Sequence, residues 1–141
     1  MDDSTKKYYR TLFLKTAQSL QKNGFDDVRL FESSSEAKKE ILTLIPEGRT
    51  VGIGGSQSVR ESGLLAELEK NRTIVKHSPE MDAAQRVEIW KKAARRDFYI
   101  ASPQAITVDG KMFFIDKYGN RVSSVIFGPG RVAHACNPST L

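Results

Sequence analysis

The sequence of 141 residues contains little that could hold a metal ion or a redox group: one cysteine and two histidines. Because Cys136 stands alone, an internal disulfide is excluded, and so is a cysteine pattern of the kind that binds an Fe–S cluster. His77 and His134 form no constellation with metal-ligand spacing, and a flavin fingerprint is missing. We therefore predict no metal site and no cofactor within this chain.

Long apolar runs are missing as well. No segment approaches the ~20 apolar residues of a membrane-spanning helix, and the opening "MDDSTKKYYR" has no apolar stretch for secretion. We therefore expect a soluble cytoplasmic protein with no membrane partner. Charges of both signs alternate along the chain, so the net charge of +5 indicates solubility and mild attraction for anions. The densest basic cluster, from Lys91 to Arg96, lacks interleaved aromatic residues, which argues against nucleic-acid binding.

What is present predicts one α/β domain. Hydrophobic residues make up 39% of the chain, which is enough for a single core. Apolar periodicity and capping residues predict helices over 4–23, 33–45, 58–70 and 82–97. Shorter apolar runs predict strands over 27–32, 49–53, 73–77 and 98–103. Strands that alternate with helices indicate a parallel sheet.

The pattern changes after residue 104. Asp109-Gly110 lies within 105–116 and predicts a hairpin with a two-residue turn, in which both central residues need positive φ. The segment 122–128 fits a short helix and a strand equally well. We expect Trp90 to lie in the core, and we interpret His77, which follows a predicted strand, as a hydrogen-bonded or exposed residue.

The stretch "RTVGIGGSQSVRE" at 49–61 places glycines and serines between a strand and a helix. It fails the dinucleotide fingerprint because Gln57 occupies the third glycine position, and no Gly-Lys-Ser/Thr follows for a P-loop. What survives is a turn whose small residues let a ligand approach free N–H groups, which favours phosphate, carboxylate or an oxyanion. Arg60 could add charge. In the alternative interpretation, a serine caps the helix and the glycines only turn the chain. The candidate ligand-binding residues are Gly54, Gly55, Ser56 and Ser58.

Two blocks, "LIPEGRTVGIGGSQSVRESGLL" and "SPQAITVDGKMFFIDKYGNRVSSVIFGPGRV", resemble the lactate-utilization (LUD) domain family in the same order. The resemblance runs from about Tyr8 to Val132. It implies a three-layer α/β/α fold with a mostly parallel sheet, similar to ribose-5-phosphate isomerase, CoA transferase and formyltetrahydrofolate cyclo-ligase. It also implies a part in cytoplasmic lactate oxidation to pyruvate, with a small anionic metabolite bound at the glycine turn.

Three groups of residues match motifs of the family. They are Gly54 to Ser56 in its glycine-serine turn, Thr107, Asp109 and Gly110 in its threonine-acidic-glycine segment, and Asp116, Gly119, Asn120 and Arg121 in its Asp-Gly-x-Gly-Asn-Arg segment. There are departures: Gln104 stands where the family usually has Asn, Val108 where it has Glu, and Lys117 where it has Gly. Val108 can neither accept a proton nor coordinate a metal.

The matched residues suggest roles in a site. Thr107, Asn120 and Arg121 would donate to a bound carboxylate or phosphate, facing the glycine turn if both motifs share the carboxyl edge of the sheet. Asp109 and Asp116 are the candidate catalytic acid/base groups, with a turn residue and a strand-end cap as the alternatives. If they act, the protein is instead a cyclo-ligase, isomerase or transferase acting on a phosphorylated or folate-like substrate. A scaffold without ligand is the third interpretation.

The last segment, "AHACNPSTL" at 133–141, departs from the family. It shows no strand periodicity, so we set it apart from a domain at 1–132 that would be truncated at its C-terminal end. A missing strand would leave an exposed sheet edge, which a second copy or other lactate-utilization subunits would cover. Any Fe–S cluster or flavin of the system would be on such partner subunits.

Overall fold

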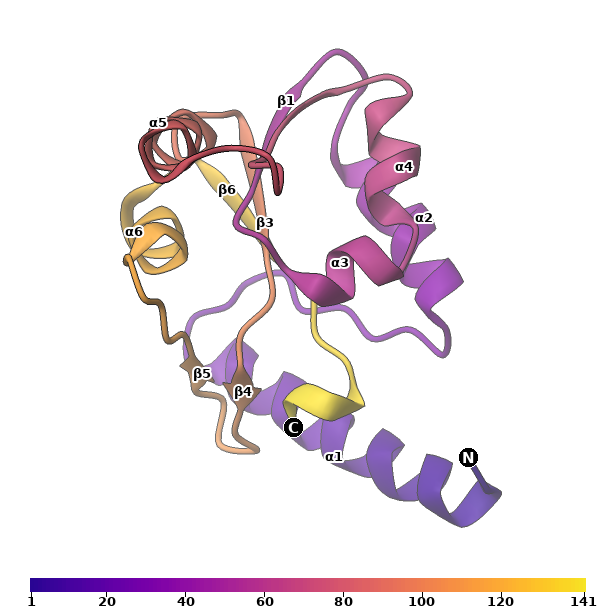
Figure 1. Ribbon diagram of the computed structural model, residues 1–141. Helices are drawn as coiled ribbons and strands as arrows, with labels where there is room; N and C mark the ends of the chain where they lie inside the picture. Colours follow the sequence, from indigo (N-terminus) through magenta and orange to yellow (C-terminus); the bar gives the residue numbers. More distant parts are fainter.

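A central sheet of four parallel strands lies between two layers of helices in the computed structural model, which describes residues 1–141 except for the side chains of Gln57 and Ser58. The sheet has the order β2-β1-β3-β6, with β1 (Thr50–Ile53), β2 (Thr73–Val75), β3 (Phe98–Ala101) and β6 (Arg131–His134). One face, the α2–α4 face, is covered by α2 (Ser34–Leu44), α3 (Gln57–Glu61) and α4 (Leu64–Glu69) (Figure 1). The other, the α5–α6 face, is covered by α5 (Ala83–Ala93) and α6 (Asn120–Phe127). The expected three-layer α/β/α fold is confirmed.

The two faces receive alternate residues of the central strands. Val51, Ile53 and Ile100 point to the α2–α4 face, where they form one buried cluster with Leu64 and Leu68. This is the alternation that an extended strand imposes on its side chains. The residues between them, such as Tyr99, point to the α5–α6 face.

Gly52 allows α5 to approach the sheet closely. A methyl group in place of its hydrogen would overlap the backbone carbonyl of Ala93 in the last turn of α5. Because that carbonyl belongs to the helix backbone, it cannot move aside as a side chain could. The glycine therefore fixes how near the α5–α6 layer lies to β1.

The helices begin where capping residues predict. Asp2 caps α1 (Asp3–Lys22), Ser33 caps α2, and Asp82 forms a capping box with Gln85 at the start of α5. The predicted helix over 58–70 is divided into α3 and α4, and this part of the prediction is wrong. Gly63 has a φ of 72°, a left-handed conformation that interrupts the helix between them.

The strand expected over 27–32 is also absent. This segment connects α1 to α2 without pairing to any strand, and its Leu30 and Phe31 side chains are exposed. Arg29 holds the connection in place through ion pairs with Asp27 and Glu40. Alternating apolar residues are thus not enough for a strand where no neighbouring strand is available to accept its hydrogen bonds.

A hairpin of β4 (Ala105–Ile106) and β5 (Met112–Phe113) confirms the antiparallel pair expected over 105–116. Its loop is longer than two residues, because Thr107 accepts a hydrogen bond from the Gly110 amide and donates its own amide to Lys111. Gly110 has a positive φ, 82°, but Asp109 does not. The open choice for 122–128 is settled as a helix, α6, up to Phe127.

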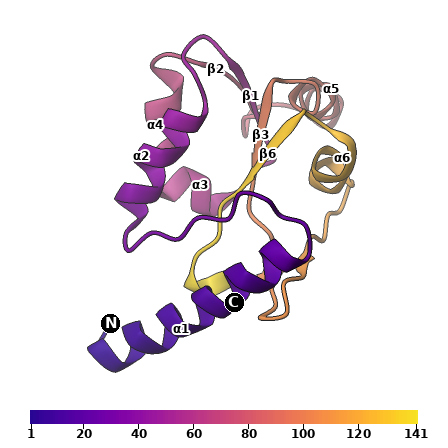
Figure 2. The ribbon, with the colours of Figure 1, turned by 180° about the vertical axis from the view of Figure 1, so that it is seen from behind.

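Three segments lie across the carboxyl ends of the strands: α1, the hairpin and a short 3-10 helix, η1 (Pro138–Thr140) (Figures 1 and 2). The Asn23 side chain at the end of α1 donates hydrogen bonds to the carbonyls of Asp109 and Gly110, which joins the hairpin to the helix. No helix of the described chain is long and apolar enough to cross a membrane.

Strand β6 crosses the boundary placed at residues 132 and 133. Ala133 pairs with Ile100 and His134 with Ala101, and the Ala135 amide still donates to the carbonyl of Ala101. The expectation that this segment has no strand is therefore wrong. Small residues with little periodicity form a strand here because the β3 edge supplies the hydrogen-bond partners.

Candidate functional site

The glycine turn, residues 54–56, follows β1 at the carboxyl edge of the sheet. Parallel strands bring the segments after β2 and β3 to the same edge, so His77 and Ser102 lie beside it. The buried hydroxyl of Ser56 donates a hydrogen bond of 2.9 Å to the Ser102 hydroxyl and accepts one of 3.4 Å from the amide of Val59. Ser56 thus holds the turn to β3 and caps α3. The Ser58 side chain, also a predicted ligand-binding group, lies outside the described side chains.

Gly54 is covered by two side chains of the α5–α6 face. A methyl group at Gly54 would overlap the Tyr99 hydroxyl and the aliphatic stem of Arg121. The structure therefore brings Arg121 and the glycine turn together, as expected if both motifs share the carboxyl edge. Only glycine allows this contact.

The guanidinium of Arg121 is engaged within the fold. Its Nε lies 2.7 Å from Oδ1 of Asp116, and its Nη2 donates to the carbonyl of Ile115 at 3.0 Å. The second carboxylate oxygen of Asp116 accepts a hydrogen bond of 2.7 Å from the amide of Val122, in the first turn of α6. With its side chain 4% exposed, Asp116 accepts a hydrogen bond from the first turn of α6 and is the ion-pair partner of Arg121.

Tyr99 completes a polar cluster under α6. The side chain is 1% exposed, and its hydroxyl is influenced by the nearby Ser124 side chain. Burial raises the pKa of the Tyr99 phenol, and the negative charge of Asp116 raises it further. The phenol therefore keeps its proton at neutral pH beside Gly54. This aromatic residue is buried, but its hydroxyl reaches the glycine turn.

His77 covers the second glycine of the turn. Gly55 has a φ of 88°, and a methyl group built on it would lie 3.0 Å from Cε1 of His77. The ring nitrogen Nδ1 of His77 accepts a hydrogen bond of 3.1 Å from the indole Nε1 of Trp90 on α5. Trp90 in turn packs against Tyr118, with ring centroids 5.2 Å apart. Segments after β1 and β2, helix α5 and the loop before α6 thus meet at this point.

The charges around His77 are positive. Burial lowers the pKa of the His77 imidazole, and the positive charges of Arg60 and Arg86 lower it further. Neither arginine has an ion pair with any residue whose side chain is described. Arg60 donates to the carbonyl of Gly55, while Arg86 donates to the carbonyl of Pro79 and has a buried Nε without a partner. Two guanidinium groups with no ion pair to a described side chain make this end of the turn attractive to an anion.

Sequence reasoning missed His77, Arg86 and Trp90 as residues of the site. One signal could have indicated His77: it comes two residues after β2, at the carboxyl edge where ligands of α/β proteins bind. Arg86 and Trp90 gave no such signal. They lie at i and i+4 on α5, so a single face of that helix carries both to His77.

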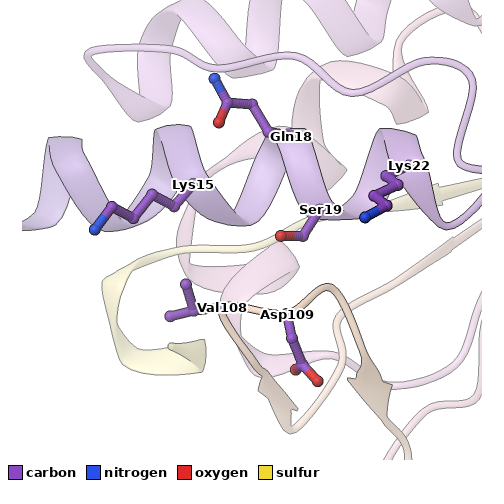
Figure 3. A pocket seen from close by; sticks show the side chains of 6 residues that line it. All are labelled: Lys15, Gln18, Ser19, Lys22, Val108 and Asp109. Atoms are coloured by element: carbon purple, nitrogen blue, oxygen red, sulfur yellow. The ribbon is translucent and has the colours of Figure 1, made fainter.

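Thr107 and Asp109 lie elsewhere, in the hairpin loop. The Asp109 carboxylate is ion-paired to Lys111 at 2.8 Å and accepts a hydrogen bond from the Thr107 hydroxyl. These contacts, first with Lys111 and then with Thr107, lower the pKa of Asp109. With Val108, Asp109 lines a hollow of about 520 Å³ against α1 (Figure 3). No hydrogen bond among the described residues joins this loop to the glycine turn.

The hollow against α1 has no convergent set of polar groups. Figure 3 shows the side chains of Lys15, Gln18 and Lys22 extending from α1 in different directions.

Asn120, the remaining predicted donor, is the first residue of α6, where its carbonyl accepts a hydrogen bond from the Ser124 hydroxyl. Among the described side chains, no group of three or more His, Cys, Asp and Glu residues could hold a metal ion.

These features define a three-layer α/β domain with a glycine turn and an uncompensated positive cluster at the carboxyl edge of its sheet. The family model of the LUD domain matches residues 14–134, and the chain belongs to this family. No curated protein and no solved structure matches the chain.

Proposed function

We propose that this LUD domain binds a small carboxylate, lactate or pyruvate, beside Gly55 and takes part in cytoplasmic oxidation of lactate to pyruvate. The observation that carries the proposal is the pair of arginines, Arg60 and Arg86, that flank His77 without an acidic partner among the described side chains. The name of the family supports lactate utilization as the setting. The contacts of the turn support the class of ligand.

A carboxylate fits the donors of this cluster. Gly55 is half-buried and has no side chain of its own that would block a ligand of a few atoms. Carboxylate oxygens form strong, charge-assisted hydrogen bonds with guanidinium N–H groups. The redox chemistry is assigned to partner subunits with Fe–S or flavin groups, since Cys136 is the only thiol of the sequence.

An enzyme acting on a phosphorylated or folate-like substrate would need a carboxylate base near the turn. The two candidates have other partners: Asp116 is bound to Arg121, and Asp109 is bound to Lys111 in the hairpin loop. The geometry therefore favours binding over acid/base catalysis.

Titration calorimetry with lactate, pyruvate, ribose 5-phosphate and inorganic phosphate tests the proposal. Arg60→Gln and Arg86→Gln should each weaken lactate or pyruvate binding about 10-fold or more, because a charge-assisted hydrogen bond contributes about 1.5–3 kcal/mol. Arg95→Gln, which removes the same charge just after α5, is the matched control and should bind as the wild type does. Equal binding by all variants would refute the site, and binding of ribose 5-phosphate without lactate or pyruvate would favour the enzyme interpretation.

A further inference from the structure

The contact between Trp90 and His77 fixes which nitrogen of the imidazole carries the proton. An indole N–H can donate a hydrogen bond but cannot accept one. The nitrogen that it faces, Nδ1 of His77 at 3.1 Å, must therefore be unprotonated. A neutral imidazole has one N–H, so the proton resides on Nε2.

The edge of the imidazole formed by Cε1 and Nε2 faces the glycine turn. Cε1 and Nε2 of His77 are its two atoms nearest to the position of a methyl group built on Gly55, at 3.0 and 3.9 Å. The Nη2 of Arg60 lies at 3.9 Å from the same position. An acceptor placed above Gly55 would therefore be near the N–H of His77 and the guanidinium of Arg60 together.

We propose that Trp90 is a positioning residue that holds His77 as the neutral Nε2–H tautomer, with this N–H as a hydrogen-bond donor to the carboxylate bound beside Gly55. The ligand part of this inference rests on the proposed function. The tautomer part rests on the indole contact alone and can be measured without ligand.

The charged groups around the ring act in the same direction as the indole. Arg60 on α3 and Arg86 on α5 are the charged groups that act on His77, and both disfavour an imidazolium. Protonation would place an N–H of Nδ1 against the N–H of Trp90, with loss of their hydrogen bond. The remaining neighbour, Tyr118, contacts the Trp90 ring. His77 is thus kept as a neutral donor over the physiological range of pH.

Long-range ¹H–¹⁵N NMR on the full chain without ligand tests the tautomer. The chain has two histidines, so the two ring systems can be assigned by a His134→Gln variant. In the wild type, His77 should show its proton on Nε2. Trp90→Phe, which keeps a ring against Tyr118, should give a mixture of tautomers and raise the pKa of His77 by about half a unit to one unit, the equivalent of one lost hydrogen bond. Tyr118→Phe is the control and should leave both unchanged.

A proton on Nδ1 in the wild type, or a Trp90→Phe spectrum identical to that of the wild type, would overturn the inference. The ligand part is tested by pyruvate titration at pH 8, where His77 is neutral in every variant. Trp90→Phe should weaken binding about 3- to 10-fold, while Tyr118→Phe should not. Equal pyruvate binding by wild type and Trp90→Phe would refute the role as a donor. If pyruvate does not bind to the wild type, the proposed function fails, and the tautomer measurement alone decides whether Trp90 positions His77.

Discussion

The two faces of the sheet are held to their helices by different kinds of contact. On the α2–α4 face, the strands and helices share one cluster of aliphatic side chains, among them Ile45, Val59 and Leu68. On the α5–α6 face, only Ala93, Tyr99 and Ala101 form the fully buried apolar cluster. Half-buried Val75, Phe114, Val125 and Val132 pack against this cluster. The polar contacts between Asp116 and Arg121 and between His77 and Trp90 lie at the carboxyl edge of the same layer.

The difference separates two tasks within one small domain. Aliphatic burial is strong but has no directional preference, so it stabilises the layer without placing any atom precisely. Hydrogen bonds and ion pairs contribute less net stability but impose distances and angles on their partners. Arg121 and His77, which lie over the glycine turn, belong to the second kind, whereas Tyr99 belongs to the apolar cluster and brings only its hydroxyl to the turn.

The largest effect is expected on the aliphatic face. Leu68 is fully buried, so Leu68→Ala removes transfer free energy and leaves a cavity, and it should lower the free energy of unfolding by about 3–4 kcal/mol. Urea denaturation followed by circular dichroism gives this value. Leu14→Ala in the exposed part of α1 makes the same chemical change and should have little effect, since Leu14 is 48% exposed. Similar losses for both variants would mean that this face does not dominate stability.

A smaller loss is expected from the ion pair on the other face. Asp116→Asn leaves the mostly buried Arg121 without a counter-charge, which should lower the free energy of unfolding by about 2–3 kcal/mol, given that the Arg121 side chain is 18% exposed. The double variant Asp116→Asn/Arg121→Gln removes both charges and should recover part of the loss. If the double variant is less stable by the sum of two independent losses, the pair is not coupled as described.

The comparison also shows which parts of the structure were accessible from the sequence. The helices of the aliphatic face follow from apolar residues at helical spacing between capping residues, as in α2 after Ser33. The ion pair of Asp116 and Arg121 forms because a turn and the start of α6 bring two residues five positions apart together. Apolar periodicity does not predict such an arrangement. The same holds for His77 and Trp90, which come from different elements and meet only after folding. The family motifs gave Gly54 and Arg121, and the shared carboxyl edge gave their proximity.

A loss of about 1 kcal/mol is expected from Tyr99→Phe, which removes a buried polar hydroxyl near Ser124. The folded state raises the pKa of this phenol above 10.0, so the unfolded chain ionises first as the pH rises. The free energy of unfolding of the wild type should therefore fall as the pH rises above about 10, and that of Tyr99→Phe should fall less. Urea titrations at pH 8 and pH 10.5 measure the difference, and equal slopes would show that Tyr99 is not protected from ionisation.

The smallest effect is expected from the other candidate carboxylate. Asp109 belongs to the same residue type and the same set of family motifs as Asp116, but its side chain is 61% exposed and its partner Lys111 is exposed as well. Exposed pairs of this kind contribute little to stability, so Asp109→Asn should leave the melting temperature unchanged. Pyruvate binding should also stay unchanged, because the hairpin loop has no hydrogen bond to the glycine turn among the described residues. If Asp109→Asn lost much of its pyruvate affinity while Arg60→Gln bound pyruvate normally, the ligand would have to be assigned to the hollow between the hairpin and α1. The site at the carboxyl edge of β1 would then be wrong.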